Sequence, residues 1–149
     1  MTKKKVVLAS GAFDLLHYGH LAFLEEAKRA GGKDAKLIVI VARDSAVQAR
    51  KGRKPIIPED QRTALIQGLK IVDEAILGFE QMDLQKVIDE LKPDIVAFGY
   101  DQADLKEEVE EIVRRKGLQI EIFQASKFRS EDIDSSTKIK RRILEDTKT

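Results

Sequence analysis

The sequence contains no cysteine, which excludes disulfide bonds and thiolate metal sites. It has only two histidines, so a structural zinc site would lack ligands. No apolar run is long enough to span a bilayer, and we therefore expect no membrane partner and a cytoplasmic protein. Acidic and basic residues nearly cancel, leaving a net charge of +1. Without a global positive field, bulk nucleic-acid binding is not favoured, and an anion site has to be local.

The 149 residues instead alternate short apolar runs with amphipathic segments. Such an alternation predicts βαβ units around a parallel sheet. We expect one Rossmann-like, doubly wound α/β domain over residues 1–149, with a five-stranded parallel sheet in the order 3-2-1-4-5 and helices on both faces. The strands are expected at 5–10, 37–42, 73–77, 94–98 and 118–123. The helices are expected at 18–30, 44–50, from Pro58 onward, 84–91, 105–116 and 135–144.

Ligands of open parallel sheets bind beyond the carboxyl ends of the strands, near the point where the strand order reverses. Three loops are then the first places to look for a site, namely those that follow Ser10, Ala42 and Phe98. Each of them comes directly after an apolar run. We therefore expect the functional residues to cluster in these loops and in the first turns of the helices that follow.

The loop after Ser10 holds both histidines of the chain, His17 and His20. Their spacing places the two side chains on one face of a helix start, where unpaired backbone N–H groups attract anions. Gly19 between them lets a phosphate approach the backbone. These residues indicate a polyphosphate site. The alternatives are two packed loop histidines, or a metal site that lacks a third ligand beyond Asp14.

The segment from Gly11 to His20, Gly-Ala-Phe-Asp-Leu-Leu-His-Tyr-Gly-His, resembles the GTFD…HxGH signature of the cytidylyltransferase-like nucleotidyltransferases. Within that superfamily, residues 41–44, 51–62, 72–78 and 92–102 look like the archaeal FAD synthetases. The chain departs from the pattern at Ala12, where the family usually has threonine. It departs again at residues 129–138, which are one residue longer than the RTxGISTT segment of cytidylyltransferases and lack its glycine.

The resemblance implies a site with three catalytic residues, His17, His20 and Lys51. It implies nucleotide contacts by Ala12, Phe13, Asp14, His17, Tyr18, Gly19, His20, Arg62, Asp101, Ser136 and Thr137. No protein ligand to a metal is expected, and Mg²⁺ is expected to arrive bound to the triphosphate.

Several of these residues also have a purely structural interpretation. Asp14 can hold its own loop through an Asx turn, and Asp101 can cap the helix that follows it. Lys51 lies next to Arg53 and Lys54, and charge runs of this kind are usually solvated loops. The basic residues Arg141 and Arg142 either contact phosphate or form a solvated face. Both interpretations stay open for these positions at the level of sequence.

A phosphate-bearing acceptor is already a nucleophile, so catalysis needs positioning and charge stabilisation at the α-phosphate rather than a catalytic base. The resemblance implies ATP as donor and FMN as acceptor, giving FAD and pyrophosphate, and it implies a homodimer. Tyr100, Phe123 and Phe128 are candidate platforms for the flavin ring. The alternatives are a cytidylyltransferase acting on a polyol phosphate such as glycerol 3-phosphate, a sugar-phosphate (heptose) adenylyltransferase, and a non-catalytic nucleotide-binding module.

Overall fold

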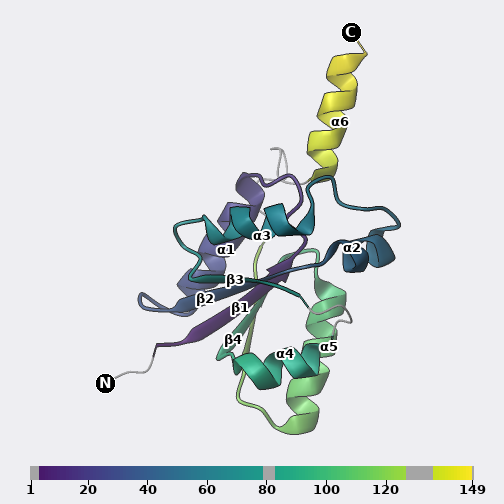
Figure 1. The fold of residues 1–149 in the computed structure, drawn as a ribbon. Coiled ribbons are helices and arrows are strands. Elements are labelled where there is room, and N and C mark those ends of the chain that lie inside the picture. The colour runs from purple at the N-terminus through teal and green to yellow at the C-terminus, as the bar shows by residue number, and fades with distance from the viewer. Residues whose placement is uncertain (1–3, 79–82, 127–135, 149) are drawn as a thin grey trace.

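Five strands form one parallel sheet in the order β3-β2-β1-β4-β5 (Figure 1). The computed structural model describes residues 4–78, 83–126 and 136–148. The strands are β1 (Val6–Gly11), β2 (Lys36–Val41), β3 (Glu74–Leu77), β4 (Ile95–Phe98) and β5 (Glu121–Gln124). The expected α/β class and strand order are confirmed.

Helices cover both faces of this sheet. They are α1 (Tyr18–Ala30), α2 (Asp44–Lys51), α3 (Glu59–Gln67), α4 (Leu84–Leu91), α5 (Ala103–Lys116) and α6 (Ser136–Thr147). Helices α1 and α3 lie on one face and α4 and α5 on the other, while α2 stands beside the carboxyl ends of the strands (Figure 1). The last turns of α6 extend away from the sheet. The order of the strands reverses between β1 and β4, which is where such folds bind ligands.

Two apolar cores hold the layers together, one on each face of the sheet. Strand β2 contributes to both, because residues 37–41 are all at most 5 % exposed and their side chains alternate between the faces. This explains the continuous apolar run in the sequence, which is typical of a central parallel strand. On one side Leu24 of α1 and Ile66 of α3 pack on the sheet, and on the other Val87 of α4 and Val109 of α5 do so.

Two aspartates just before strands anchor the neighbouring strand. The carboxylate of Asp73 accepts a hydrogen bond from the Leu37 N–H at 2.7 Å, and that of Asp94 accepts one from the Val6 N–H at 2.8 Å. Asp73 also pairs with Lys28 of α1 at 3.2 Å. Burial alone would raise the pKa of Asp73, but the hydrogen bonds from Leu37 and Lys28 lower it on balance.

The boundaries of most elements agree with expectation to within one or two residues, and α1 and α4 agree fully. The exceptions are α6, which runs three residues past the expected Leu144, and the fifth strand, which was expected from Leu118 but begins at Glu121. Leu118 and Ile120 are apolar because they pack against the core beside α4 and α5. The ladder starts later because β4 begins only at Ile95, the partner of Glu121. Burial and strand pairing are thus separate properties at this point.

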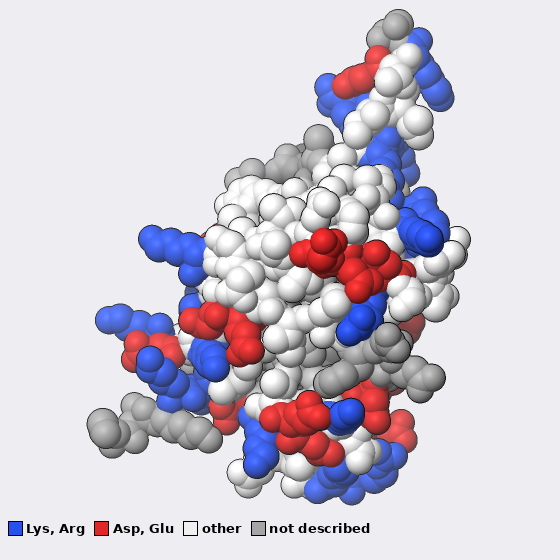
Figure 2. Space-filling view, viewed as in Figure 1, with Lys and Arg blue, Asp and Glu red and all other residues white. Residues whose placement is uncertain are grey.

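The surface carries no field of one sign on the face seen in Figure 2. Basic and acidic side chains are interspersed there, around an uncharged area in the upper part of the body (Figure 2). Within residues 4–78, 83–126 and 136–148, no helix is both long and apolar enough to cross a membrane.

Candidate active site

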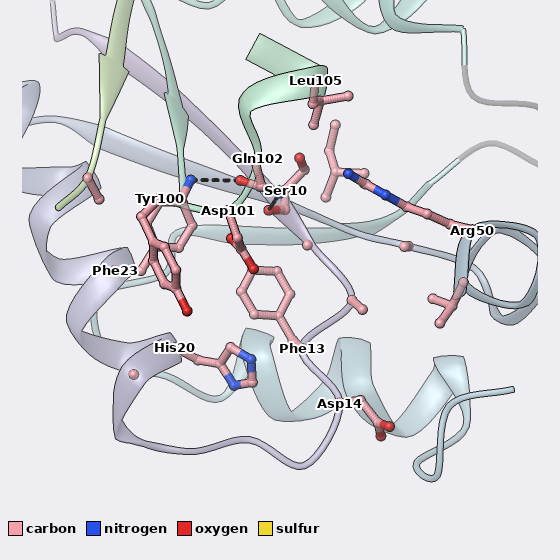
Figure 3. A pocket seen from close by; sticks show the side chains of 18 of the residues that line it. Ser10, Phe13, Asp14, His20, Phe23, Arg50, Tyr100, Asp101, Gln102 and Leu105 are labelled. Atoms are coloured by element: carbon pink, nitrogen blue, oxygen red, sulfur yellow. Dashed lines mark hydrogen bonds between the residues drawn. The ribbon is translucent and has the colours of Figure 1, made fainter. Parts of the chain in front are cut away.

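A cavity of about 400 Å³ opens at the carboxyl ends of the strands (Figure 3). Its wall comes from the residues that follow four strands, with Ala12 after β1, Ala42 after β2, Gly99 after β4 and Ala125 after β5. Helices α1 and α2 supply the flanks. The volume lies in the range of small-molecule sites, about 300–1,000 Å³. The three loops expected to hold the site therefore meet in one cavity.

The loop from β1 to α1 has an unusual backbone. Phe13 and Leu15 adopt left-handed conformations, with φ of 55° and 51°, which residues other than glycine rarely adopt. A Cβ on Gly11 would lie 3.0 Å from the Phe13 ring, so glycine at this position lets the ring lie close against the end of β1. Backbone strain of this kind is concentrated at functional sites. Here it places the Phe13 ring beside His20.

His17 and His20 meet at the start of α1. Their rings stack with centroids 3.8 Å apart, and the Phe13 ring meets His20 edge-on at 5.4 Å. His17 is the N-cap of the helix, and its backbone N–H donates to Nδ1 of His20 at 3.3 Å. Both histidines line the cavity. The pair therefore sits where the helix N-terminus favours an anion.

The electrostatic environment keeps His20 neutral. Burial, followed by the charges of His17 and Lys51, lowers the pKa of His20 to about 3, although Asp14 opposes the shift. Because Nδ1 accepts from the His17 N–H, the neutral ring carries its proton on Nε2. His20 can thus donate one hydrogen bond to an incoming phosphate at any physiological pH. Lys51 lines the same cavity as His20.

Asp14 joins the β1–α1 loop, which lines the cavity, to the segment before α3. Its carboxylate accepts hydrogen bonds from the backbone N–H groups of Ile56 and Ile57, both at 2.9 Å. The residue is only 6 % exposed and lines the cavity. Asp14 therefore fixes the β1–α1 loop against the segment before α3.

Arg62 completes this connection from below the cavity. Its side chain is fully buried and donates to the carbonyl oxygens of Ile57 at 2.8 Å and Ala12 at 2.6 Å. A third hydrogen bond, at 2.6 Å, joins it to the carboxylate of Asp44 in the first turn of α2. Arg62 does not line the cavity. It acts on the site by joining the β1–α1 loop and α2, which both line the cavity, to the segment before α3.

Helix α2 brings two cations to the cavity in its last turn, Arg50 and Lys51. Gly52 ends the helix in the left-handed conformation, with φ of 76°, which a side chain would disfavour. Arg53 and Lys54 lie beyond this stop and do not line the cavity. Figure 3 shows the Arg50 side chain reaching inward from the side opposite His20. Of the cations in this segment, the structure brings Lys51 and Arg50 to the site.

The loop after β4 forms the wall across from α2. Gly99, Tyr100, Asp101 and Gln102 all line the cavity. Gln102, not Asp101, is the N-cap residue of α5. The structural interpretation, in which Asp101 caps the helix that follows it, is therefore wrong.

Helix α6 contributes Thr137 to the wall, while Arg141 and Arg142 are exposed and lie outside it. Arg142 pairs with Asp146 at 3.3 Å along the helix. The side chain of Ser136 lies outside the described residues.

The structure thus gathers most of the expected site residues around one space. Those that line it are Ala12, Phe13, Asp14, His17, Gly19, His20, Lys51, Asp101 and Thr137. Tyr18 is exposed on α1 and does not line the cavity. Of the candidate ring platforms, Tyr100 lines it, Phe123 does not, and Phe128 lies outside the described residues.

The wall residues that sequence reasoning missed include Phe23, Glu26, Arg50 and Gln102. The spacing in the sequence could have indicated Phe23, which is three residues after His20, and Glu26, which is three residues after Phe23. Residues three apart on a helix are neighbours on its surface. No such spacing indicates Arg50 and Gln102, because the way their side chains turn depends on contacts with other segments.

No group of three or more histidine, aspartate, glutamate or cysteine side chains that could hold a metal occurs among residues 4–78, 83–126 and 136–148. Asp101 and Glu26 are acidic residues on the cavity wall. Mg²⁺ is commonly held by one or two carboxylates together with substrate phosphates. The donor set therefore fits a cation that arrives with a polyphosphate rather than one resident in a protein cage.

Comparison with known proteins places these features in a family. The chain is 48% identical over 142 residues to the FAD synthase of Methanothermobacter marburgensis, covering 95% of this chain and 87% of the relative. It is 47% identical over 143 residues to the FAD synthase of Archaeoglobus profundus, covering 96% and 88%. The crystal structure of the lipopolysaccharide core biosynthesis protein from Thermoplasma volcanium is similar, with a TM-score of 0.75, 41% identity, and coverage of 85% and 99%.

The sequence model of one family extends over nearly the whole chain, matching residues 8–142. The match includes the histidine pair, α2 and the wall formed by Tyr100 and Asp101. Together with the FAD synthases above, it identifies a nucleotidyltransferase enzyme. The chain belongs to the Cytidylyltransferase-like family.

Proposed function

We propose that the chain transfers AMP from ATP to FMN, giving FAD and pyrophosphate. The observation that carries the proposal is the stacked pair of His17 and His20 at the N-terminus of α1, where Nδ1 of His20 accepts a hydrogen bond from the His17 N–H. The relatives named FAD synthase, at 48% and 47% identity, support the choice of donor and acceptor.

The reaction joins a phosphate oxygen of FMN to the α-phosphorus of ATP. The bond between that phosphorus and the oxygen that bridges to the β-phosphate breaks, and pyrophosphate leaves with the electron pair. No protein base is needed, because the attacking phosphate is already anionic. His20 donates from Nε2 to an oxygen of the α-phosphate, and its neutrality means that no proton is lost in the step. His17, Lys51 and the N-terminus of α1 stabilise the charge that develops.

A divalent cation, for which we propose Mg²⁺, accompanies the triphosphate and neutralises part of its charge. Asp101 and Glu26 are the acidic residues at the cavity that could hold it. The carboxylate of Asp14 is committed to Ile56 and Ile57 and is less suited to that task.

The acceptor is proposed to occupy the side of the cavity between α2 and α5. Ile40, Val47 and Leu105 are apolar residues of the cavity wall, from β2, α2 and α5 respectively. Arg50 reaches in from α2 (Figure 3). A flat, largely apolar ring system that carries a phosphate has both of the features that this wall complements. Tyr100, on the wall formed after β4, is then left for the nucleotide or for the edge of the flavin ring.

A second candidate is transfer of AMP to a sugar phosphate. It is favoured by the printed name of the Thermoplasma volcanium relative, a lipopolysaccharide core biosynthesis protein. The apolar wall argues against it, because a sugar phosphate presents hydroxyl groups that need polar partners. The two candidates share the donor and differ only in the acceptor.

An end-point assay separates them. Purified protein is incubated with ATP or CTP and Mg²⁺ against FMN, glycerol 3-phosphate and heptose phosphate, and release of pyrophosphate is measured. We expect release with ATP and FMN, together with FAD detected by chromatography. Release with ATP and heptose phosphate alone would establish the second candidate, and release with CTP and glycerol 3-phosphate alone would overturn both.

The proposal includes three further points about the whole chain. Residues 1–149 form one folding unit, which predicts a single cooperative unfolding transition. The protein works in the cytoplasm as a homodimer, and sedimentation equilibrium measures its state of association.

A further inference from the structure

The cavity lies where two loops leave neighbouring strands in different directions. Strands β1 and β4 are paired from Val7 with Ile95 to Ala9 with Ala97. Beyond that pairing, β1 continues into the loop that carries the histidines, and β4 continues into the loop that carries Tyr100 and Asp101. Both loops line the cavity. Their separation therefore depends on whatever joins them past the last pair of the ladder.

The side-chain amide of Gln102 makes that join. Its Oε1 accepts a hydrogen bond from the Gly99 N–H at 2.7 Å, and its Nε2 donates to the Ser10 carbonyl oxygen at 3.1 Å (Figure 3). One amide thus links the strand ends on both sides of the point where the strand order reverses. It uses one acceptor and one donor, a pairing that the uncharged amide provides at any pH.

The local structure is built to keep the amide there. Gln102 is the N-cap residue of α5, yet its side chain makes no capping bond to that helix. A Cβ on Gly99 would lie 3.1 Å from Oδ1 of Asp101 and 3.5 Å from Oε1 of Gln102. Glycine at 99 therefore lets both side chains turn back over the end of β4. Helix α5 therefore lacks the stabilising hydrogen bond of an N-cap side chain. This indicates that the hydrogen bond from Gln102 to Ser10 serves a purpose other than the stability of α5.

We propose that Gln102 is a positioning residue that sets the separation between the histidine loop and the Tyr100–Asp101 loop of the nucleotide site. The inference rests on the proposed function only for its kinetic consequence. A bound nucleotide has to touch both loops at once, with phosphates at His17 and His20 and the remainder toward Asp101. Misplacement by about 1 Å can cost on the order of 100-fold in rate even when the altered residue lies outside the chemistry.

The kinetic test compares two substitutions of Gln102. Gln102→Met keeps the length of the side chain and removes both hydrogen bonds, and it is expected to lower kcat by about 10- to 100-fold. KM for ATP should change by less than about threefold, because alignment matters most in the transition state. Gln102→Glu keeps the shape, but its ionised form cannot donate to Ser10.

Protonation supplies a signature that a merely structural role would not produce. A protonated glutamic acid again has one donor and one acceptor, so kcat of Gln102→Glu relative to wild type should rise as the pH falls from 8 toward 5. Gln102→Met should show a constant ratio. Gln85→Glu, on α4, is the matched control, because Gln85 accepts from Arg115 on the surface and lies outside the cavity. Its ratio to wild type should stay near one throughout.

Two results would overturn the proposal: kcat of Gln102→Met within threefold of wild type, or a ratio for Gln102→Glu that does not vary with pH. Amide chemical shifts of the free proteins test the same claim without any substrate. In Gln102→Met, changes are expected at residues 10–20 and 99–101, and changes confined to α5 would contradict positioning. Absence of FAD formation by the wild type would refute the proposed function, while the chemical shifts would still decide the role of Gln102.

Discussion

The buried arginine below the cavity offers the sharpest test of how the site is held together. Replacing Arg62 by methionine keeps an unbranched side chain in the core and removes all three hydrogen bonds. The carbonyl oxygens of Ala12 and Ile57 lose their donor, and the carboxylate of Asp44 loses its cation at 2.6 Å. Arg62 is 0% exposed, whereas the side chain of Asp44 is 33% exposed and can be rehydrated in part.

These losses set the expected magnitude. An unsatisfied buried acceptor costs about 1–3 kcal/mol, and breaking a buried ion pair costs about 3–5 kcal/mol. The contributions share one side chain and do not add, so we expect Arg62→Met to lower the free energy of unfolding by about 3–5 kcal/mol. That is a large fraction of the total stability of a domain, about 5–15 kcal/mol. Arg62→Lys should recover less than half, because an ammonium group cannot reach all three acceptors.

Urea unfolding followed by far-ultraviolet circular dichroism measures the change, since the chain has no tryptophan to report by fluorescence. The matched control is Lys116→Met, which breaks a surface pair with Asp89 at 3.3 Å. It should cost less than about 1 kcal/mol. A loss below 1 kcal/mol for Arg62→Met, or one equal to the control, would refute the interpretation of Arg62 as the residue that joins these segments.

Three further predictions concern charge. The ring signals of His20, identified by loss in His20→Asn, should not titrate between pH 5 and 8, and a midpoint near 6.5 would contradict the pKa of about 3. Between pH 6.5 and 3 the unfolded chain binds a proton that folded His20 does not, so the stability of the wild type should fall faster with falling pH than that of His20→Asn. The lowered pKa of Asp73 predicts that Asp73→Asn is less stable than wild type at pH 7. The loss should be less than about 1 kcal/mol, because the ion pair of Asp73 with Lys28 is partly exposed. The difference should shrink as the pH falls below 3.8, and a difference in urea midpoints that stays constant with pH would count against this prediction. Lys51→Met should lower kcat by about 10- to 100-fold at unchanged stability. Arg53→Met changes a cation outside the cavity and should leave kcat within twofold of wild type. Equal effects of the two substitutions on kcat would exclude a specific role for Lys51.

Much of this architecture could be predicted from the sequence because it follows from local patterns. The apolar run at β2 and the helical spacing of apolar residues in α1 predict the layers of the fold. The two histidines with Gly19 indicate a helix start that can bind anions. The resemblance to nucleotidyltransferases then supplied the donor and the acceptor.

The parts that could not be predicted depend on contacts between distant segments. Nothing near Arg62 in the sequence indicates that its partners are Ala12 and Asp44, and an arginine in an acidic helix start resembles a surface residue. Gln102 occupies a position where a capping side chain is usual, but its amide turns to Ser10, which lies in another strand. Arg50 lines the cavity from the last turn of α2, and the direction of its side chain depends on how that helix packs in the fold.

The central claim is that the histidine pair stabilises the transition state of nucleotidyl transfer. The most direct measurement is kcat for FAD formation from ATP and FMN by His20→Asn, which keeps an acceptor and a donor for the local backbone but displaces the group that meets the phosphate. The account predicts a fall of about 100-fold or more, with the free energy of unfolding at pH 7 little changed and KM for ATP within about threefold. A kcat within tenfold of wild type, equivalent to about 1.4 kcal/mol, would contradict it.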